Sequence, residues 1–353
     1  MGRIISRNRR EIASKRLKFL FYEIVPIFIV IFVFLILEWI LLPLIVNQTT
    51  ALYGMLLYLI RALAIFLVVI LFLFVSNKFK TKNSQPNKKE LAPHIGYLKL
   101  YKMSKKNYGY QLLYSFLLFF LILIPLEFFF SLFSTETVAY RAISLIFKIE
   151  NSYLLLNNIS QFLLFSIIIQ LSISFSNETI FRGVITKRGS EHFNDISAVM
   201  ISTFSFTFIE FFLNPIMFTA SFYIGIIWFI KSFIVGLVFS LTIIRRKWLL
   251  PLIIAKTFDS ILSSVIIWEF LRGGNFTQLL IFIYIPLLII SLILLILQRS
   301  RVKESLQVGI KMIKSYSRND ITKDESTGDK IFRILFDIFL AFLLFLFGIL
   351  ISV

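Results

Sequence analysis

The 353 residues are 58% hydrophobic and only 16% charged, so most of the chain is expected to be solvated by lipid rather than by water. Cysteine is absent, which excludes disulfides, thiolate metal sites and cysteine nucleophiles. Only two histidines occur, and a zinc site would therefore need mostly carboxylates, which is unusual. We expect no metal and no other cofactor.

Nine apolar segments follow one another along the chain, and most can cross a ~30 Å hydrocarbon core at ~1.5 Å per helical residue. No barrel-like alternation is visible, and lipid then favours helices. The predicted fold class is all-α, a polytopic transmembrane helical bundle with about nine spans. These spans are 24–46, 53–76, 111–134, 152–176, 196–213, 222–244, 248–268, 276–297 and 331–353.

The formal net charge of +18 is explained by membrane topology. If the N-terminus is inside, 31 of the 37 Lys and Arg residues fall in inside segments and three in outside loops. The positive-inside rule then predicts an N-in and C-out orientation, and no nucleic-acid partner is needed. The basic arm 1–18 and the basic segment 78–90 are expected to lie against anionic headgroups, which makes membrane lipid a partner.

Ionisable residues inside lipid-spanning segments are costly and indicate function by default. Arg61 and Glu38 could form a structural pair across the first two helices. In the fourth span, Ser166, Gln170 and Asn177 share one helical face. Three separate helices bring charges to membrane depth, which favours one shared polar centre. The ionisable residues in the spans are Glu38, Arg61, Glu127, Glu178, Arg182, Glu210, Lys231, Lys256, Asp259 and Asp337.

Three motifs in series lie in this central region. The first is Asn177-Glu178-x-x-x-Arg182 followed by Gly183. The second contains Phe206-x-x-x-Glu210, and a helix bearing Gly236 follows it. The third follows Pro251 and reads Ala255-x-x-x-Asp259. In order and spacing this series resembles the CAAX-processing and bacteriocin-processing (CPBP, or Abi) intramembrane proteases, whose motifs are Glu-Glu-x-x-x-Arg, Phe-x-x-x-His and His-x-x-x-Asn/Asp.

The resemblance implies a division of the chain into three ranges. Residues 1–151 would hold the basic arm and three transmembrane helices, residues 152–268 a CPBP-like helical core, and residues 269–353 the C-terminal helices with a basic inside loop. In that family the first glutamate is regarded as the group that activates a water, and the two histidines and the Asn/Asp complete the polar site. Members cleave prenylated proteins near the C-terminus or process bacteriocin-like peptides.

This chain departs from the family at the positions that the chemistry uses. Asn177 replaces the first glutamate and cannot act as a general base. Glu210 and Ala255 occupy the two histidine positions, and the enzymatic activity is therefore an open question. We expect the catalytic set, if there is one, to be Glu178, Arg182, Glu210 and Asp259. Asn177, Gln170, Phe206 and Lys256 are expected to bind substrate.

Glu178 and Arg182 are spaced to pair along one helix. We also expect Glu210 and Lys256 to form an ion pair across the former active cavity, because an uncompensated charge there would be expensive.

Four functions are consistent with this pattern. The first is a pseudoprotease that binds a hydrophobic or lipidated peptide or a membrane protein partner. The second is an active endopeptidase that uses Glu178 or Glu210 as a displaced base. The third and fourth are a transporter and a structural subunit of a membrane complex. A prokaryotic cell membrane is the expected location, and an internal eukaryotic membrane is the alternative.

Overall fold

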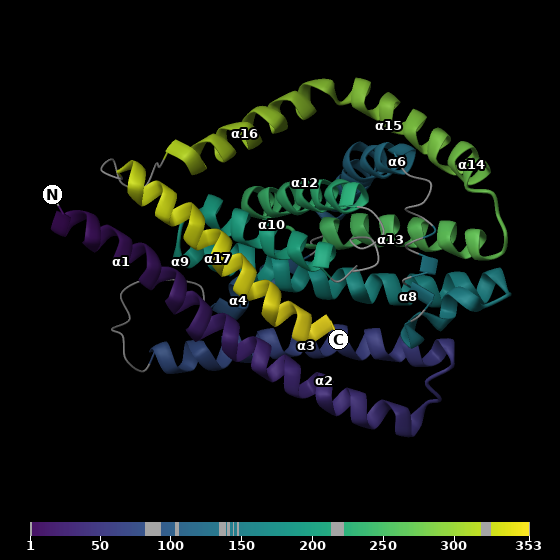
Figure 1. The fold of residues 1–353 in the computed structure, drawn as a ribbon, viewed down its shortest axis with the longest axis horizontal. Helices are drawn as coiled ribbons and strands as arrows, with labels where there is room; N and C mark the ends of the chain where they lie inside the picture. Colours follow the sequence, from purple (N-terminus) through teal and green to yellow (C-terminus); the bar gives the residue numbers. More distant parts are fainter. Residues whose placement is uncertain are drawn as a thin grey trace.

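A computed structural model of the chain describes residues 2–81, 93–102, 106–133, 139, 142–143, 145–146, 148–212, 222–318 and 326–352. Their elements are helical throughout and form an elongated bundle (Figure 1). Most of the basic segment 78–90 lies outside the described residues. The first half contains α1 (Gly2–Phe19), η1 (Leu20–Ile24), α2 (Val25–Ile45), α3 (Ala51–Thr81), α4 (Pro93–Leu98), η2 (Lys99–Tyr101), α5 (Tyr108–Leu118), η3 (Phe119–Leu123), α6 (Ile124–Phe133) and η4 (Ile149–Leu155).

The second half contains the motif-bearing helices and the C-terminal helices. Helices α15 and α16 form a bent arch along one edge of the bundle, and α17 returns beside α1 (Figure 1). The elements are α8 (Ile159–Glu178), η5 (Thr179–Arg188), α9 (Gly189–His192), α10 (Asp195–Phe212), α12 (Phe222–Arg246), α13 (Leu250–Leu271), α14 (Phe276–Leu279), η6 (Leu280–Tyr284), α15 (Ile285–Leu297), α16 (Arg299–Arg318) and α17 (Thr327–Ser352).

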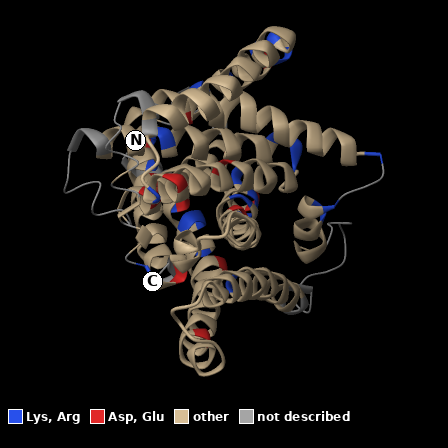
Figure 2. Cartoon of the chain, turned by 90° about the vertical axis from the view of Figure 1, so that its right-hand side faces the viewer, with Lys and Arg blue, Asp and Glu red and all other residues tan. Residues whose placement is uncertain are grey.

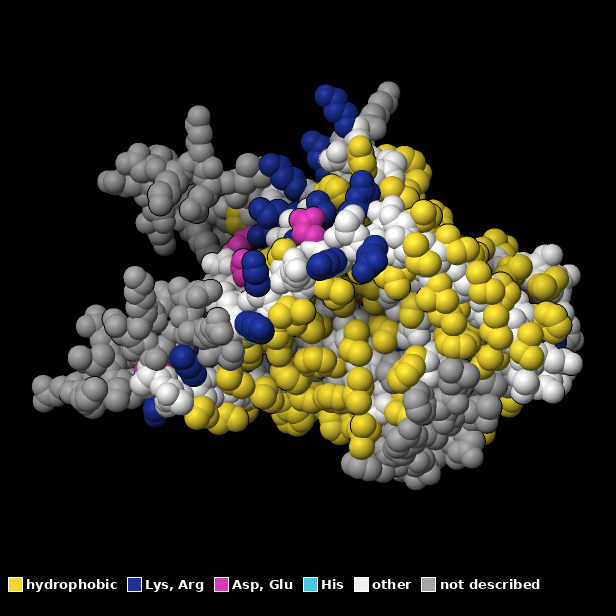
Figure 3. All heavy atoms as spheres, turned by 90° about the horizontal axis from the view of Figure 1, so that it is seen from above, with side chains coloured by type: hydrophobic (Ala, Val, Ile, Leu, Met, Phe, Trp, Pro, Cys, Tyr) yellow, Lys and Arg dark blue, Asp and Glu magenta, His cyan; other side chains and the backbone are white. Residues whose placement is uncertain are grey.

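Nine helices of the described residues are long and apolar enough to cross a membrane. The predicted all-α membrane protein with about nine spans is thus confirmed, while the N-in and C-out orientation stays a prediction. A broad hydrophobic area covers much of the face seen in Figure 3, and Lys and Arg gather toward one end of it. The nine helices are Arg9–Ile45, Ala51–Asn77, Tyr108–Phe129, Ile159–His192, Asp195–Phe212, Gly225–Arg246, Leu250–Leu271, Thr277–Leu297 and Thr327–Ile349.

The predicted boundaries of the fourth span were wrong at both ends. The helix begins at Ile159, where the Asn158 side chain caps it by accepting from the backbone N–H groups of Ser160 and Gln161. It then continues through the π-helical η5 to His192. Polar residues suggested a loop after residue 176, but tertiary packing buries them.

The wide turn of η5 is stabilised by hydroxyl groups. The backbone carbonyl of Phe181 accepts from the Thr186 hydroxyl at 2.9 Å and from the Ser202 hydroxyl of α10 at 2.7 Å. Carbonyls freed by π-type geometry need such donors in lipid. The local fold of the first motif therefore depends on a neighbouring helix.

One large apolar core runs through all three predicted ranges of the chain, from Phe19 on α1 to Leu344 on α17. Helix α10 packs against α12 and α17, and α8 packs against α3 and α13. Gly236 lets α12 approach α10 closely, because a Cβ there would lie 3.3 Å from both Phe206 and Thr203. The motif-bearing helices are thus held at the centre of the bundle.

Candidate polar centre and its relatives

The helices that carry the second and third motifs both pack against the α8–η5 helix, which carries the first. Element η5 contacts both α10 and α12, and α13 runs along α8. Each element brings part of the predicted site: Glu178 and Arg182 come from the α8–η5 helix, Phe206 and Glu210 from α10, and Lys256 and Asp259 from α13. The shared polar centre expected from the sequence is therefore supported by how the helices pack.

Glu178 and Arg182 form the innermost ion pair of this centre. The Arg182 Nε atom lies 3.2 Å from Glu178 Oε2, and the two side chains are 0% and 1% exposed. The i,i+4 pairing predicted from the sequence is confirmed. The pair neutralises two charges that would be prohibitive singly in a low-dielectric environment.

Aromatic rings surround the Arg182 guanidinium. Its central carbon lies 4.5 Å from the Phe206 ring centroid, 5.6 Å from that of Phe239 and 5.7 Å from that of Phe181. Its Nη1 and Nη2 atoms are buried and have no hydrogen-bond partner among the described residues. Cation–π attraction is the main interaction left to them. Phe206, predicted to bind substrate, is buried against Arg182.

A second ion pair lies on α13. Lys256 Nζ is 2.9 Å from Asp259 Oδ2, so this pair lies within a single helix. Glu210 interacts electrostatically with both Lys256 and Arg182, which brings charges of all three motifs into one field. The direct Glu210–Lys256 pair across the cavity stays a prediction.

The substituted motif positions differ in their surroundings. Asn177 is partly buried beside Glu178, whereas Ala255 is fully buried and belongs to the large apolar core. A methyl group can neither transfer a proton nor bind a metal. The third motif therefore brings only the carboxylate of Asp259 and the ammonium of Lys256 to possible chemistry.

Gln170, predicted to bind substrate, forms hydrogen bonds with side chains of two neighbouring elements. Its side-chain amide nitrogen donates to the Tyr153 hydroxyl at 2.9 Å and to the Ser264 hydroxyl at 3.0 Å. These bonds join α8 to η4 and α13. Further along α8, the hydroxyls of Ser166 and Ser174 are buried without a hydrogen-bond partner among the described residues, and the predicted polar face thus points into the bundle.

Two tyrosines near the first motif were not predicted from the sequence. The Tyr101 hydroxyl lies 2.7 Å from the Thr179 hydroxyl and 3.0 Å from the Tyr97 hydroxyl. Tyr97 packs against Gly183, where a Cβ would lie 3.0 Å from the ring. The glycine of the first motif was the available signal, since it indicates the close approach of another group. Burial raises the pKa of the Tyr101 phenol to about 12.

The charged region extends beyond the motifs. Lys231 of α12 forms a buried ion pair with Glu127 of α6, and its Nζ lies 4.6 Å from the Trp228 ring centroid. Glu127 also interacts electrostatically with Lys256. Acidic and basic positions lie near one another within the bundle (Figure 2). Outside this centre, Arg61 Nε and Glu38 Oε2 lie 3.0 Å apart, which confirms the predicted structural pair.

Neither histidine belongs to the polar centre. His192 lies in α9, with its Nε2 2.8 Å from Glu23, and the ring of His94 packs edge-on against Phe74. Among the described residues, no group of three or more His, Cys, Asp or Glu side chains could hold a metal ion. The chemistry available at the centre is that of carboxylates, an amide and two cations.

Comparison with known proteins assigns this central region. Residues 159–262 match the family model described as "Rce1-like: Type II CAAX prenyl endopeptidase Rce1-like", and this range includes every predicted site residue. No curated protein and no solved structure gives a significant match. The chain is an integral membrane protein with an Rce1-like segment at residues 159–262, which confirms the resemblance read from the three motifs and is consistent with membership of the CPBP family.

Proposed function

We propose that this protein is a catalytically impaired CPBP-like membrane protein that binds a hydrophobic or lipidated peptide, or a membrane partner carrying one. The observation that carries the proposal is the Glu178–Arg182 pair, which is buried among three phenylalanine rings. The guanidinium engages this carboxylate, which is only 1% exposed, so a water that it could activate has no access to it. Its neighbour at the first glutamate position is the amide of Asn177.

The substituted third motif supports the same proposal. Ala255 is packed in the apolar core, and no other residue of that motif restores an imidazole. Asn177 and Lys256 are the most suitable candidates for peptide contact, because both are partly exposed beside the pair. An amide can hydrogen-bond a peptide backbone, and an ammonium can bind a terminal carboxylate. The protein would bind such a peptide without cleaving it.

An active endopeptidase is the second candidate, and the position of Glu210 favours it. Glu210 is only partly buried and stands at a histidine position of the family. Lys256 and Arg182 interact electrostatically with it, however, and no imidazole stands at either histidine position of the family. We therefore place binding before catalysis.

A peptidase assay separates the two functions. The purified protein in detergent is incubated with a fluorogenic farnesylated peptide, and the variants are Glu178→Gln, Glu210→Gln and, as a matched control, Glu38→Gln. Glu38 is also an intramembrane carboxylate paired with an arginine, but it lies outside the motifs. We expect no cleavage by any form. Cleavage abolished by Glu178→Gln or Glu210→Gln but not by Glu38→Gln would refute the pseudoprotease.

Binding is measured separately with a photoactivatable farnesylated peptide. We expect cross-linking to the wild-type protein, competition by unlabelled farnesylated peptide, and weaker cross-linking to Asn177→Leu than to Glu38→Gln. Equal labelling by the same peptide without its farnesyl group would show that the lipid is not recognised. Absence of specific cross-linking would refute peptide binding.

A further inference from the structure

The segment α4–η2, residues 93–101, lies between the spanning helices α3 and α5 and runs back along α3. His94 near its start packs edge-on against Phe74, and Tyr101 at its end packs edge-on against Phe66. From position 74 to position 66 is about 12 Å along a helix. Phe66 lies near the middle of the spanning helix Ala51–Asn77. The segment therefore enters the bundle from the Thr81 end of α3 instead of remaining at that end.

At this depth, α4–η2 covers one side of the helix that carries the first motif. The Tyr101 hydroxyl lies 2.7 Å from the Thr179 hydroxyl, and the Tyr97 ring lies against Gly183, where a Cβ would come within 3.0 Å of it. Thr179 directly follows Glu178, and both side chains are buried. The two tyrosines thus close the side of the first motif that contains Thr179 and Gly183.

Hydroxyl and carbonyl groups attach the segment to its other neighbours. The Leu100 carbonyl accepts from the backbone N–H of Leu249 at 2.9 Å, and the Lys102 carbonyl accepts from the side-chain amide of Gln111 at 3.2 Å. On its other side, the segment is open, with Ile95 45% exposed. Water can replace each of these hydrogen bonds, and short elements with an exposed side open at low free energy. Because α4–η2 is no part of a spanning helix, it can move without unpacking one.

We propose that α4–η2 is a movable cover of the first motif, which opens when a peptide binds beside this motif. In the closed position the rings of Tyr97 and Tyr101 fill the space next to Gly183 and Thr179. In the open position the Thr179 hydroxyl and the backbone at Gly183 are available to the peptide. The coupling to a peptide rests on the proposed function, whereas the opening itself does not.

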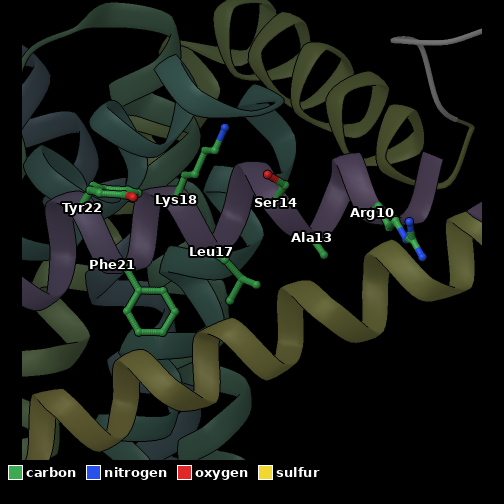
Figure 4. A pocket seen from close by; sticks show the side chains of 7 residues that line it. All are labelled: Arg10, Ala13, Ser14, Leu17, Lys18, Phe21 and Tyr22. Atoms are coloured by element: carbon green, nitrogen blue, oxygen red, sulfur yellow. The ribbon is translucent and has the colours of Figure 1, made fainter. Parts of the chain in front are cut away.

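The opening is measured by thiol labelling, because the chain has no cysteine and each introduced thiol reports alone. Leu100→Cys reports on the cover. Leu73→Cys on α3 is the matched control, since both leucines are buried in the same apolar core. Ser14→Cys, on the stretch of α1 drawn in Figure 4, gives the rate of an exposed thiol. We expect a small maleimide to label Leu100→Cys more slowly than Ser14→Cys and to leave Leu73→Cys unlabelled. Equal protection of Leu100→Cys and Leu73→Cys would overturn the proposal.

The contact at Gly183 supplies a variant that favours the open position. In the Leu100→Cys background, Gly183→Ala crowds Tyr97 and should raise the labelling rate roughly fivefold or more, because it destabilises the closed position. Gly96→Ala is the matched control: Gly96 lies in α4 itself, and a Cβ there would meet nothing within 4 Å. Tyr101→Phe removes the hydroxyl that anchors η2 and should also speed labelling, which keeps the test decisive if Gly183→Ala does not fold. Identical rates in all these backgrounds would contradict a movable cover.

The coupling to a peptide is tested with the same variants. Farnesylated peptide should raise the labelling rate of Leu100→Cys, and its photoactivatable form should cross-link more strongly to Gly183→Ala than to Gly96→Ala, because less free energy is then needed to open the cover. A peptide that cross-links but changes neither quantity would show that it does not use the cover. If the wild-type cross-links no peptide, the proposed function fails and the coupling with it, while the labelling rates still decide whether the segment opens.

Discussion

Arg182 is the most buried cation of the polar centre, and its surroundings decide what it can do. The Glu178 carboxylate satisfies its charge, and the rings of Phe206 and Phe239 cover the guanidinium. None of its three guanidinium nitrogens forms a hydrogen bond among the described residues. Unpaired buried donors cost free energy. The attraction between Glu178 and Arg182 has to offset this cost in the folded protein.

The first prediction follows from this balance. Arg182→Met keeps the side-chain length but leaves Glu178 as an unpaired buried charge, and we expect a loss of stability of about 3–5 kcal/mol. The double variant Glu178→Gln/Arg182→Met removes both charges and should recover most of that loss. Thermal unfolding in detergent measures both variants. If the double variant is no more stable than Arg182→Met, the ion pair is not the source of the effect.

The second prediction concerns alkaline pH and Tyr101. Burial raises the folded-state pKa of this phenol to about 12, whereas the unfolded value is about 10. The neutral phenol is thus favoured by folding. Its contribution to stability is fully present below pH 10 and is lost as the pH rises from 10 to 12.

Tyr101→Phe removes this titration. The variant should lose stability at neutral pH, because the Thr179 and Tyr97 hydroxyls lose a partner, and its stability should fall less steeply than that of the wild-type between pH 10 and 12. Unfolding midpoints measured across this range check the slope. Tyr110→Phe is the control, since Tyr110 is 69% exposed. Identical slopes for Tyr101→Phe and wild-type would contradict the prediction.

At the level of elements, the lengths of the apolar segments were enough to predict nine membrane-spanning helices. An apolar run of about 20 residues has the length that a helix needs to cross the hydrocarbon core. The continuation of the fourth helix through η5 was not predictable in this way. Thr179 and Thr186 are polar in sequence and buried in the structure, and each forms a hydrogen bond with a hydroxyl group distant in sequence, that of Tyr101 or of Ser240. Tyr101 lies 78 residues from Thr179, and a local pattern cannot reveal such a contact.

The candidate site, too, was predictable from the sequence only in part. The pairing of Glu178 with Arg182 followed from helical spacing, since both residues lie on one helix. The enclosure of Arg182 by Phe239, and the bonds that tie Gln170 to η4 and α13, required the packing of separate helices. Spacing along one helix is readable in a sequence, whereas the facing surface of a second helix is not.

The third prediction tests the contact between α3 and η4. Gly54 lies against the backbone of Glu150, and a Cβ at this position would come within 2.0 Å of the carbonyl oxygen. Gly54→Ala must therefore push the two elements apart, and we expect a destabilisation of about 1–3 kcal/mol. Thermal unfolding of the purified variant provides the measurement.

Gly109 offers a matched control for this change. It lies in α5, and a Cβ there would meet nothing within 4 Å. Gly109→Ala should be neutral or stabilising by up to about 1 kcal/mol, because alanine loses less backbone entropy in a helix than glycine. Equal effects of the two substitutions would mean that close packing at Gly54 is not what limits stability.

For the whole molecule, charge placement links the two ends of the chain. Arg9 and Arg16 on the first helix pair with Asp329 and Asp337 on the last. Part of the basic arm that was expected to lie against headgroups is thus neutralised within the protein, and Arg10 and Lys18 are left to face outward. Within this one segment, Arg9 and Arg16 hold the first helix against the last, whereas Arg10 and Lys18 contribute to the positive charge expected on the inside of the membrane.

The last prediction concerns orientation. Because the chain has no cysteine, single cysteines report their own accessibility without background. Asn47 and Asn275 lie in exposed connections between spans, and Lys303 is exposed on α16. The positive-inside rule places the first two outside and the third inside. A membrane-impermeant maleimide should therefore label Asn47→Cys and Asn275→Cys in intact cells, and Lys303→Cys only after the membrane is opened. The reverse pattern would show a C-in and N-out chain. Labelling of all three in intact cells would instead show that the reagent crosses the membrane, so a cytoplasmic marker protein is labelled in parallel.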